Sequence, residues 1–421
     1  MTKPSVSVII VSRGRPDDLR LCLTAVSQLH YDAFEIVVVS DQAGLDVVQS
    51  RTFSNQIKTA LCEQANISVA RNIGLDLSSG SIVAFIDDDS VPEPGWLLHL
   101  AAVFQSNTVA AATGYIRGKN GISYQSMATT IDHFGVTAPI NIDGLRPTVF
   151  GRSANVTIKT IGTNCAFRRQ VFEKLGGFDP GFAYFLDEAD INIRLSNTEM
   201  ETAIVPLAQV HHRVSASEHR LPNRAPRTLF QVGKSTAIFL RKHCPSADRD
   251  KAALVMEQLQ QTQLTRHVGL GNCDQNEADR LMATMRAGVV AGQSVKLEKP
   301  RPIAPATGPF TRFSRQPNTG QHLYISGFWL FRRRLRNMAA AAVARGDSVT
   351  LFIFSLTTLF HKMRFHRGGY WVQTGGLFGR SERTERLFRW YFPKDRAAKE
   401  RKRLALVRHP WDIEGNQTKT P

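Results

Sequence analysis

Residues 1–90 alternate apolar, strand-like runs with segments of helical periodicity, and this alternation is the pattern of a doubly wound α/β unit. The first run, Val6 to Val11, has the apolar character of a strand buried inside a parallel sheet. Because the expected strands are connected by expected helices, we predict an α/β fold with a mostly parallel sheet. Further strands are expected at residues 35–40, 59–62 and 81–86, and helices at residues 16–29 and 66–77.

Beyond residue 90 the pattern continues and then changes. Strands are expected at 109–117 and 156–161, and helices at 168–175 and 187–197. Five prolines between residues 299 and 317 are typical of a linker, and the 322–354 stretch has a strand–helix–strand pattern. The predicted boundaries are 1–215 for the α/β domain, 216–298 for a helical segment, 299–320 for a proline-rich linker and 321–421 for a basic C-terminal α/β extension.

The strand expected at 81–86 leads directly into Asp87, Asp88 and Asp89. Ligands of open α/β sheets bind at the carboxyl ends of the strands, where these acids are expected. Three adjacent carboxylates repel one another unless a cation neutralises them, and their hard oxygens suit Mn²⁺ or Mg²⁺. Taken alone, the triplet is explained equally simply by a solvated acidic turn that caps a helix.

Five blocks of about residues 5–215 resemble the family-2 glycosyltransferases of the GT-A fold, in the order and rough spacing of that family. The resemblance implies a metal-dependent enzyme that uses a nucleotide-diphosphosugar donor. It further implies transfer, with inversion, to a hydroxyl of a glycan or lipid-linked acceptor in the synthesis of bacterial surface or exported polysaccharide. The blocks are VSVIIVSRGRPDDLRLCL, EIVVVSDQ, SVARNIGLDLSSGSIVAFIDDD, GTNCAFRRQVFEKLGGFDPGF and DEADINIRL.

The resemblance also implies roles for individual residues. Asp89 matches the metal ligand, and either His211 or His212 is implied to complete the metal site. Arg71 could instead be a residue of a helix surface with no role in binding. Asp41 could be an ordinary turn residue after a strand. The positions implied to bind the nucleotide sugar are Ser12, Arg13, Asp41, Arg71, Asn72, Asp87 and Asp88, and those implied to line the acceptor side are Gly162, Thr163 and Asn164.

A general base is expected near residue 188, because sugar transfer to a hydroxyl requires removal of its proton. The sequence has Asp187 followed by Glu188 where the family has Glu followed by Asp. Glu188 stands at the position of the catalytic acid and is the candidate base, while Asp187 remains an alternative because the glutamate is one methylene longer. Acidic residues also favour a helix N-terminus without any catalytic role.

The basic charge belongs to the C-terminal part, since residues 301–421 carry a net +16 and residues 1–300 a net +1. Anionic lipid, nucleic acid or an anionic polysaccharide would complement it, and a plain solvated face is the alternative. Arginines interleaved with aromatic residues favour an anionic membrane surface as the partner of residues 321–421. Nucleic acid is not expected, because no motif of a nucleic-acid reader is present.

The expected location is the cytoplasm, with peripheral contact to the inner face of the plasma membrane. The sequence contains no run of 18 apolar residues, so no transmembrane helix is expected. The N-terminus has the pattern of a first strand and not that of a signal peptide. The five scattered cysteines indicate a reducing compartment.

Two other classes of protein remain open. A nucleotidylyltransferase would carry a glycine-rich phosphate loop after the first strand, where this chain has only Gly14. A non-catalytic protein that binds a sugar nucleotide or a polyanion would show no hydrolysis of the donor.

Overall fold

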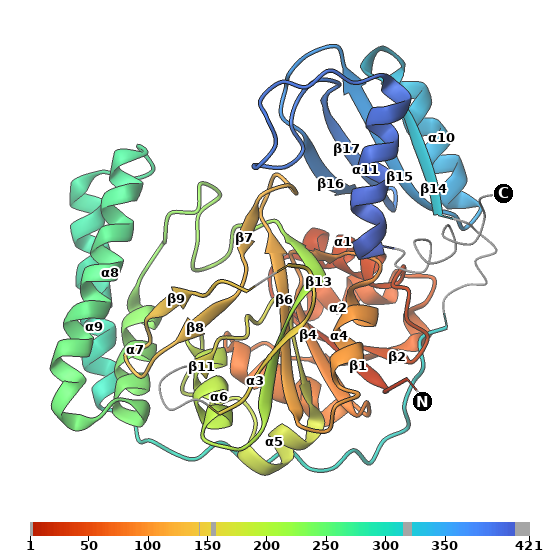
Figure 1. Ribbon diagram of the computed structural model, residues 1–421. Helices are drawn as coiled ribbons and strands as arrows, with labels where there is room; N and C mark the ends of the chain where they lie inside the picture. Colours follow the sequence, from red (N-terminus) through yellow and green to blue (C-terminus); the bar gives the residue numbers. More distant parts are fainter. Residues whose placement is uncertain (1–2, 143, 153–156, 315–321, 409–421) are drawn as a thin grey trace.

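The computed structural model describes residues 3–142, 144–152, 157–314 and 322–408. A large sheet with helices on its faces forms the N-terminal domain, and a four-stranded sheet with its own helices forms a module beside it (Figure 1). The helices α8 and α9 stand on the other side of the molecule (Figure 1). Within the described part of the chain, no helix combines the length and the apolar character needed to cross a bilayer.

The large sheet confirms the α/β prediction, with strand order β10-β13-β6-β12-β4-β1-β2-β3. Only β12 and β10 run antiparallel to the neighbours on this path, so the sheet is mostly parallel. Two short strands extend this sheet: β5 pairs with β13, and β7 pairs with β6. The strands are β1 (Val6–Ser12), β2 (Phe34–Ser40), β3 (Ile57–Leu61), β4 (Ile82–Asp87), β5 (Ser90–Pro92), β6 (Val109–Arg117), β7 (Tyr124–Ser126), β10 (Thr148–Phe150), β12 (Cys165–Arg168) and β13 (Glu201–His212).

Six helices pack on the faces of this sheet or follow its strands. Asp41 and Asn66 are N-cap residues of two of them, and each side chain accepts a hydrogen bond from a backbone N–H in the first turn. These caps explain why both helices begin directly where a strand or loop ends. The helices are α1 (Pro16–Val26), α2 (Gln42–Gln49), α3 (Ile67–Leu77), α4 (Trp96–Val103), α5 (Arg169–Leu175) and α6 (Asp187–Ser196).

The secondary structure departs from the sequence prediction in a few places. Helix α2 and strand β12 were not predicted, and the strand expected at 156–161 is only Thr157–Ile158 (β11), with Val156 outside the described residues. Strand β11 belongs to a separate three-stranded sheet with β8 (Thr129–Ile131) and β9 (Thr137–Pro139). Strand β13 includes both His211 and His212 at its end.

The helical segment consists of α7 (Phe230–His243), α8 (Arg249–Gly269) and α9 (Gln275–Gln293). Helices α7 and α9 approach closely through glycines: a Cβ at Gly233 would lie 2.0 Å from a carbonyl oxygen of α9, and a Cβ at Gly288 would lie 2.0 Å from one of α7. Helix α7 also packs Ile238 and Phe239 against apolar residues of α6. The helical segment is therefore anchored to the α/β domain.

The stretch predicted as a linker is packed against the α/β domain through residue 314. Ile303 and Phe313 are buried in two different parts of the domain core. The backbone N–H of Phe313 donates to the carbonyl of Phe34 at 2.8 Å, and that of Ile303 donates to Phe172 at 3.1 Å. Two apolar residues thus hold the described part of this proline-rich stretch against the α/β domain.

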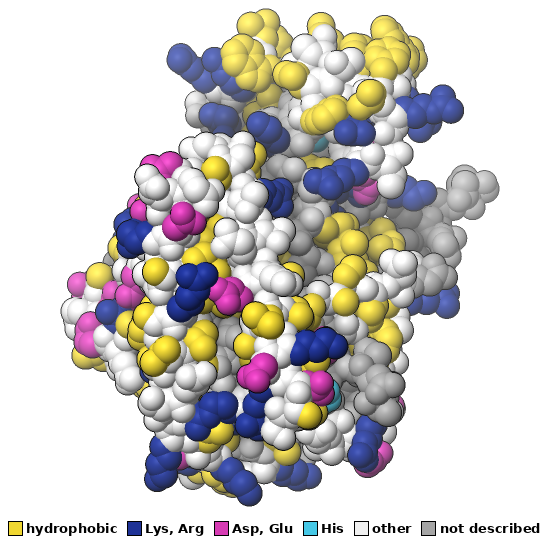
Figure 2. Space-filling view, turned by 90° about the vertical axis from the view of Figure 1, so that its left-hand side faces the viewer, with side chains coloured by type: hydrophobic (Ala, Val, Ile, Leu, Met, Phe, Trp, Pro, Cys, Tyr) yellow, Lys and Arg dark blue, Asp and Glu magenta, His cyan; other side chains and the backbone are white. Residues whose placement is uncertain are grey.

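The C-terminal module stands at the top of the molecule in Figures 1 and 2. Its sheet has the order β14-β15-β17-β16, and the predicted strand–helix–strand unit is present as a parallel β14–α10–β15 crossover. Apolar residues of α10 and the sheet form one core, and α11 with the other face forms a second. The elements are β14 (His322–Phe328), α10 (Arg332–Ala344), β15 (Ser348–Ser355), β16 (Lys362–His366), β17 (Tyr370–Gly376) and α11 (Pro393–Arg408).

A buried ion pair joins the module to the N-terminal domain. Arg408, at the end of α11, donates from Nε to Glu93 Oε2 at 2.7 Å and from Nη2 to Oε1 at 3.2 Å. Both side chains are buried, and the guanidinium also contacts Thr350 and lies 4.5 Å from the ring centroid of Trp371. Strong electrostatic attraction and full hydrogen bonding offset the desolvation of these charges.

Replacing Arg408 with alanine should therefore destabilise the protein by about 3–5 kcal/mol, because Glu93 would remain buried without its cation. Lys402→Ala on the exposed side of the same helix is the matched control and should change stability little. Thermal and urea unfolding of both variants measure the difference. Equal unfolding of Arg408→Ala and Lys402→Ala would contradict a structural role for the pair.

Candidate active site

The candidate site lies at the carboxyl ends of β1 and β4, which are parallel neighbours in the sheet. Asp87 is the last residue of β4, and Asp88 and Asp89 form the turn between β4 and β5, so the three side chains do not share one direction. Strand β13 reaches the same place by pairing with β5, where His212 lies opposite Ser90. These pairings bring a histidine from far along the sequence to the aspartates.

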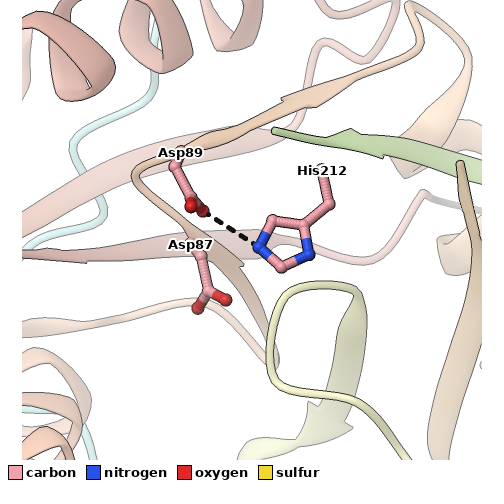
Figure 3. A group of neighbouring side chains, drawn as sticks. All are labelled: Asp87, Asp89 and His212. Atoms are coloured by element: carbon pink, nitrogen blue, oxygen red, sulfur yellow. Dashed lines mark ion pairs between the residues drawn. The ribbon is translucent and has the colours of Figure 1, made fainter. Parts of the chain in front are cut away.

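Asp87, Asp89 and His212 form one cluster, which we call the metal-type cluster (Figure 3). One carboxylate oxygen from each aspartate and one imidazole nitrogen all lie within 4.8 Å of one another. His212 Nε2 is 3.2 Å from Asp89 Oδ1, and the other oxygen of Asp89 accepts a hydrogen bond from the Ser215 backbone at 2.8 Å. Two carboxylates and an imidazole suit Mn²⁺, and the carboxylates also suit Mg²⁺.

Asp89 is ionised throughout the neutral pH range. Burial alone would raise its pKa, but the hydrogen bond and charge of His212, with Arg15 and the Ser215 N–H, lower it to about 2. The carboxylate form that a divalent cation requires is therefore present without the cation.

Asp88 lies apart from this cluster, although it was grouped with the donor-binding acids. Its side chain is buried, accepts a hydrogen bond from the Ser12 hydroxyl at 2.7 Å and pairs with Arg15 Nη2 at 2.5 Å. Asp88 and Ser12 therefore hold the end of β4 against the end of β1. Arg15, which also reaches Asp89 at 3.3 Å, was missed by the sequence reasoning; the available signal was a second arginine beside Arg13.

Arg71 is buried at the centre of the site and is not a helix-surface residue. Its guanidinium pairs closely with Asp187, lies 3.5 Å from Glu188 and lies 3.7 Å from Asp87. Burial works to lower its pKa, but these three carboxylates raise it above its ordinary value. Arg71 consequently stays charged and links the metal-type cluster to the acids of α6.

The two acids at the start of α6 have different environments. Phe185 and Leu186, directly before the helix, have φ values of 75° and 64°, an uncommon left-handed conformation for such residues. Glu188 Oε1 accepts a hydrogen bond from the Gly162 backbone N–H at 2.9 Å. The Glu188 side chain is 21% exposed, whereas that of Asp187 is only 4% exposed. Glu188 is therefore the acid that a substrate can reach.

The pKa values of Asp187 and Glu188 also distinguish the two acids, because they shift in opposite directions. Burial and the neighbouring Glu188 charge raise the pKa of Asp187 well above its usual range. Burial also opposes ionisation of Glu188, but Arg71 and Lys159 lower its pKa. Of the two acids, Glu188 therefore has the lower pKa.

Gly162 is the one residue of the expected acceptor-side triplet that faces these acids. A Cβ at Gly162 would lie 2.1 Å from both Arg71 Nη2 and Glu188 Oε1, so only glycine fits. Thr163 and Asn164 are buried instead. The Asn164 amide donates to two backbone carbonyls and accepts from Trp96, which uses it in the scaffold and corrects its expected place at the acceptor.

The remaining donor-binding candidates divide between a pocket and the scaffold. Asn72 donates to and accepts from the backbone of Phe178, so both ends of its amide serve the fold. Arg13 and Asp41 line a pocket of about 580 Å³ that also includes Asp87, Asp89 and His212. Asp41 holds the pocket's first loop by accepting a hydrogen bond from the Gly14 N–H at 2.7 Å.

His211 is directed away from the metal-type cluster, which corrects its candidacy as a ligand beside His212. Its Nε2 lies 2.8 Å from Glu93 Oε1, and its ring lies 4.6 Å from that of Trp371 in the C-terminal module. The alternation of side chains along β13 separates the two histidines. Pocket residues that sequence reasoning missed include Ser215 and His219, whose ring stacks on Tyr184 at 4.1 Å, and no local motif marks either.

Curated proteins with related sequences are glycosyltransferases or glycan-synthesis proteins. A glucosyl-dolichyl phosphate glucuronosyltransferase of Haloferax volcanii is 28% identical over 223 residues, covering 50% of this chain and 69% of the relative. The O-antigen biosynthesis protein RfbC of Myxococcus xanthus is 25% identical, covering 51% and 18%. The probable glycosyltransferase YdaM of Bacillus subtilis is 30% identical, covering 49% and 50%. The chain thus spans half or less of the last two.

Solved structures align with low similarity. GalNAc-T7 with UDP, GalNAc and Mn²⁺ has 17% identity and a TM-score of 0.46, over 70% of this chain and 58% of that chain. The mannosyltransferase PcManGT of Pyrobaculum calidifontis, with GDP-Man and Mn²⁺, has 14% identity and a TM-score of 0.42, over 70% and 88%. Residues 7–176 match the family described as Glycosyl transferase family 2. Within the N-terminal domain, residues 7–176 of this chain are therefore similar to glycosyl transferase family 2.

Proposed function

We propose that the protein transfers a sugar, with inversion, from a nucleotide-diphosphosugar to a hydroxyl of a glycan or lipid-linked acceptor. The observation that carries this proposal is the junction at Arg71. This one buried guanidinium contacts Asp87 of the metal-type cluster on one side and Glu188 on the other. A pocket of about 580 Å³ that contains the cluster offers space for the donor.

The residues of the site divide the chemical work. Glu188, ionised and reachable, would accept the proton of the acceptor hydroxyl as the new bond forms. Asp87, Asp89 and His212 would hold Mn²⁺ or Mg²⁺, which would stabilise the charge on the departing nucleoside diphosphate. Arg71 fixes the positions of Asp87 and Glu188, so that base and leaving-group site keep a constant separation.

The named relatives support a role in glycan assembly. One is a glucuronosyltransferase for a dolichyl phosphate-linked sugar and another serves O-antigen biosynthesis. We therefore favour an acceptor that is a growing glycan, free or lipid-linked, within bacterial surface or exported polysaccharide synthesis. The enzyme would work on the cytoplasmic side, at the inner face of the plasma membrane.

The metal site can be tested with Asp89→Asn. In the unchanged protein, a nucleoside diphosphate at 100 times its Kd together with Mn²⁺ should stabilise the fold by about 2.7 kcal/mol. Asp89→Asn should lose most of the metal-dependent part of this effect, because an amide is a poor ligand for a hard cation. Thermal unfolding with and without Mn²⁺ measures it, and an undiminished metal effect would show that the triplet is only a turn.

The two histidines provide a matched pair for the same measurement. His212→Gln should weaken the Mn²⁺-dependent stabilisation, whereas His211→Gln should leave it intact because His211 contacts Glu93 and not the cluster. The assignment of His212 fails if the two substitutions have the same effect on metal-dependent nucleotide binding.

The base can be tested with Glu188→Gln and Asp187→Asn. Glu188→Gln should keep donor binding near normal and lower turnover by about 10²–10⁴-fold, the usual loss when a general base is removed. Asp187→Asn should mainly reduce stability, because Arg71 loses its closest partner. Donor binding, turnover and thermal unfolding separate these outcomes. A purely catalytic defect in Asp187→Asn, with Glu188→Gln active, would reverse the assignment.

A further inference from the structure

Three loops at one end of the C-terminal module expose large apolar side chains. Leu330 is 77% exposed, Trp390 is 65% exposed and Phe392 is 67% exposed. We call these loops, residues 329–334, 356–361 and 377–392, the apolar tip. Its exposed apolar residues are Trp329, Leu330, Phe331, Leu356, Leu359, Phe360, Leu387, Phe388, Trp390 and Phe392.

The topology of the module brings these loops together. Strands β14, β15 and β17 are parallel, so the loops that follow them leave the same edge of the sheet. Figure 2 shows hydrophobic side chains gathered at the top of the module, with Lys and Arg side chains next to them. Both faces of the sheet already have buried cores, so these side chains are not needed to complete the fold. Soluble monomers rarely expose so much contiguous apolar surface.

Arginines surround the apolar side chains. Arg332 lies 3.6 Å from the ring centroid of Trp329, and Arg380 lies 4.3 Å from that of Phe360. A pocket of about 720 Å³ is lined by Arg380, Arg386 and Arg389 of the third loop, together with Glu385, the aromatic residues Phe388, Trp390 and Tyr391, and the buried Arg396 of α11. The tip therefore combines apolar side chains with sites for anionic groups.

Helix α11 contributes less free charge than its sequence suggests. Arg396 and Arg403 both pair with Glu400, and Arg408 pairs with Glu93. Those cations hold the module together and are not available to an external partner. Within the tip, Arg333, Arg334, Arg386 and Arg389 are exposed beside the apolar groups, and Arg332 and Arg380 are half-buried.

We propose that the apolar tip docks on an anionic lipid bilayer. The tryptophan, phenylalanine and leucine side chains would enter the boundary between headgroups and acyl chains, while the arginines bind lipid phosphates. Nucleic acid would complement the arginines but offers no apolar phase for the leucines. Docking by the tip goes beyond the proposed sugar transfer and needs neither donor nor metal, so the two can fail independently.

The experiment measures binding of the full-length protein to vesicles of phosphatidylcholine, alone or mixed with phosphatidylserine. Binding should require the anionic lipid and weaken at high salt, because ions screen the arginines. Among the described tryptophans Trp96 and Trp371 are buried, so Trp329 and Trp390 should dominate a blue shift of emission on binding. Brominated acyl chains should quench this emission if the side chains enter the bilayer.

Two pairs of matched variants test the surface. Leu330→Ser with Leu387→Ser should weaken vesicle binding by about tenfold or more, whereas Leu254→Ser with Leu270→Ser, equally apolar and exposed on the helical segment, should not. Arg386→Gln with Arg389→Gln should weaken binding to anionic vesicles, whereas Arg146→Gln with Arg266→Gln should do so less.

Thermal unfolding and nucleotide binding confirm that each variant remains folded. Equal vesicle binding by the tip variants and their controls would overturn the proposal. An absence of vesicle binding by the unchanged protein would also overturn it. Binding to duplex nucleic acid, or a dimer that depends on the tip, would then identify the other partner of this surface.

Discussion

A single buried cation, Arg71, holds the candidate active site together. A buried guanidinium is costly unless carboxylates surround it, and here they come from the end of β4 and the start of α6. Arg71 itself is carried by α3, so three separate elements must be in place before its charge is compensated. The distance between Asp87 and Glu188, on which the proposed metal and base chemistry would jointly depend, is thereby set by the fold.

The end of β13 extends this constraint to the rest of the molecule. His212 faces the aspartates, and its neighbour His211 faces Glu93, which binds Arg408 of the last described helix. Adjacent residues of β13 therefore contact the metal-type cluster (His212) and the ion pair that attaches the C-terminal module (His211). A module attached so close to the candidate site limits the approach to it from that side, and it gives the apolar tip a defined orientation relative to the metal-type cluster.

The sequence predicted the position of the site better than the direction of its side chains. The apolar runs predicted the parallel strands, and the acidic triplet lies at the end of β4, where Asp87, Asp89 and His212 come together. Which acids face the cluster depends on the turn between β4 and β5, and which histidine joins them depends on the pairing of β13 with β5. The scaffold roles of Asn72 and Asn164 depend on backbone groups distant in sequence, so no local pattern revealed them.

Charge and proline content were the least informative signals. The proline-rich stretch contains Ile303 and Phe313, and these two apolar anchors outweigh the general tendency of such stretches to be linkers. Likewise, the net +16 of residues 301–421 does not distinguish cations that are paired inside the module from those that face solvent. Only the folded arrangement separates Arg408, which is structural, from Arg386, which lies exposed beside the apolar tip. The burial and pairing of each arginine, and not the net charge, therefore decide which cations remain available to an external partner.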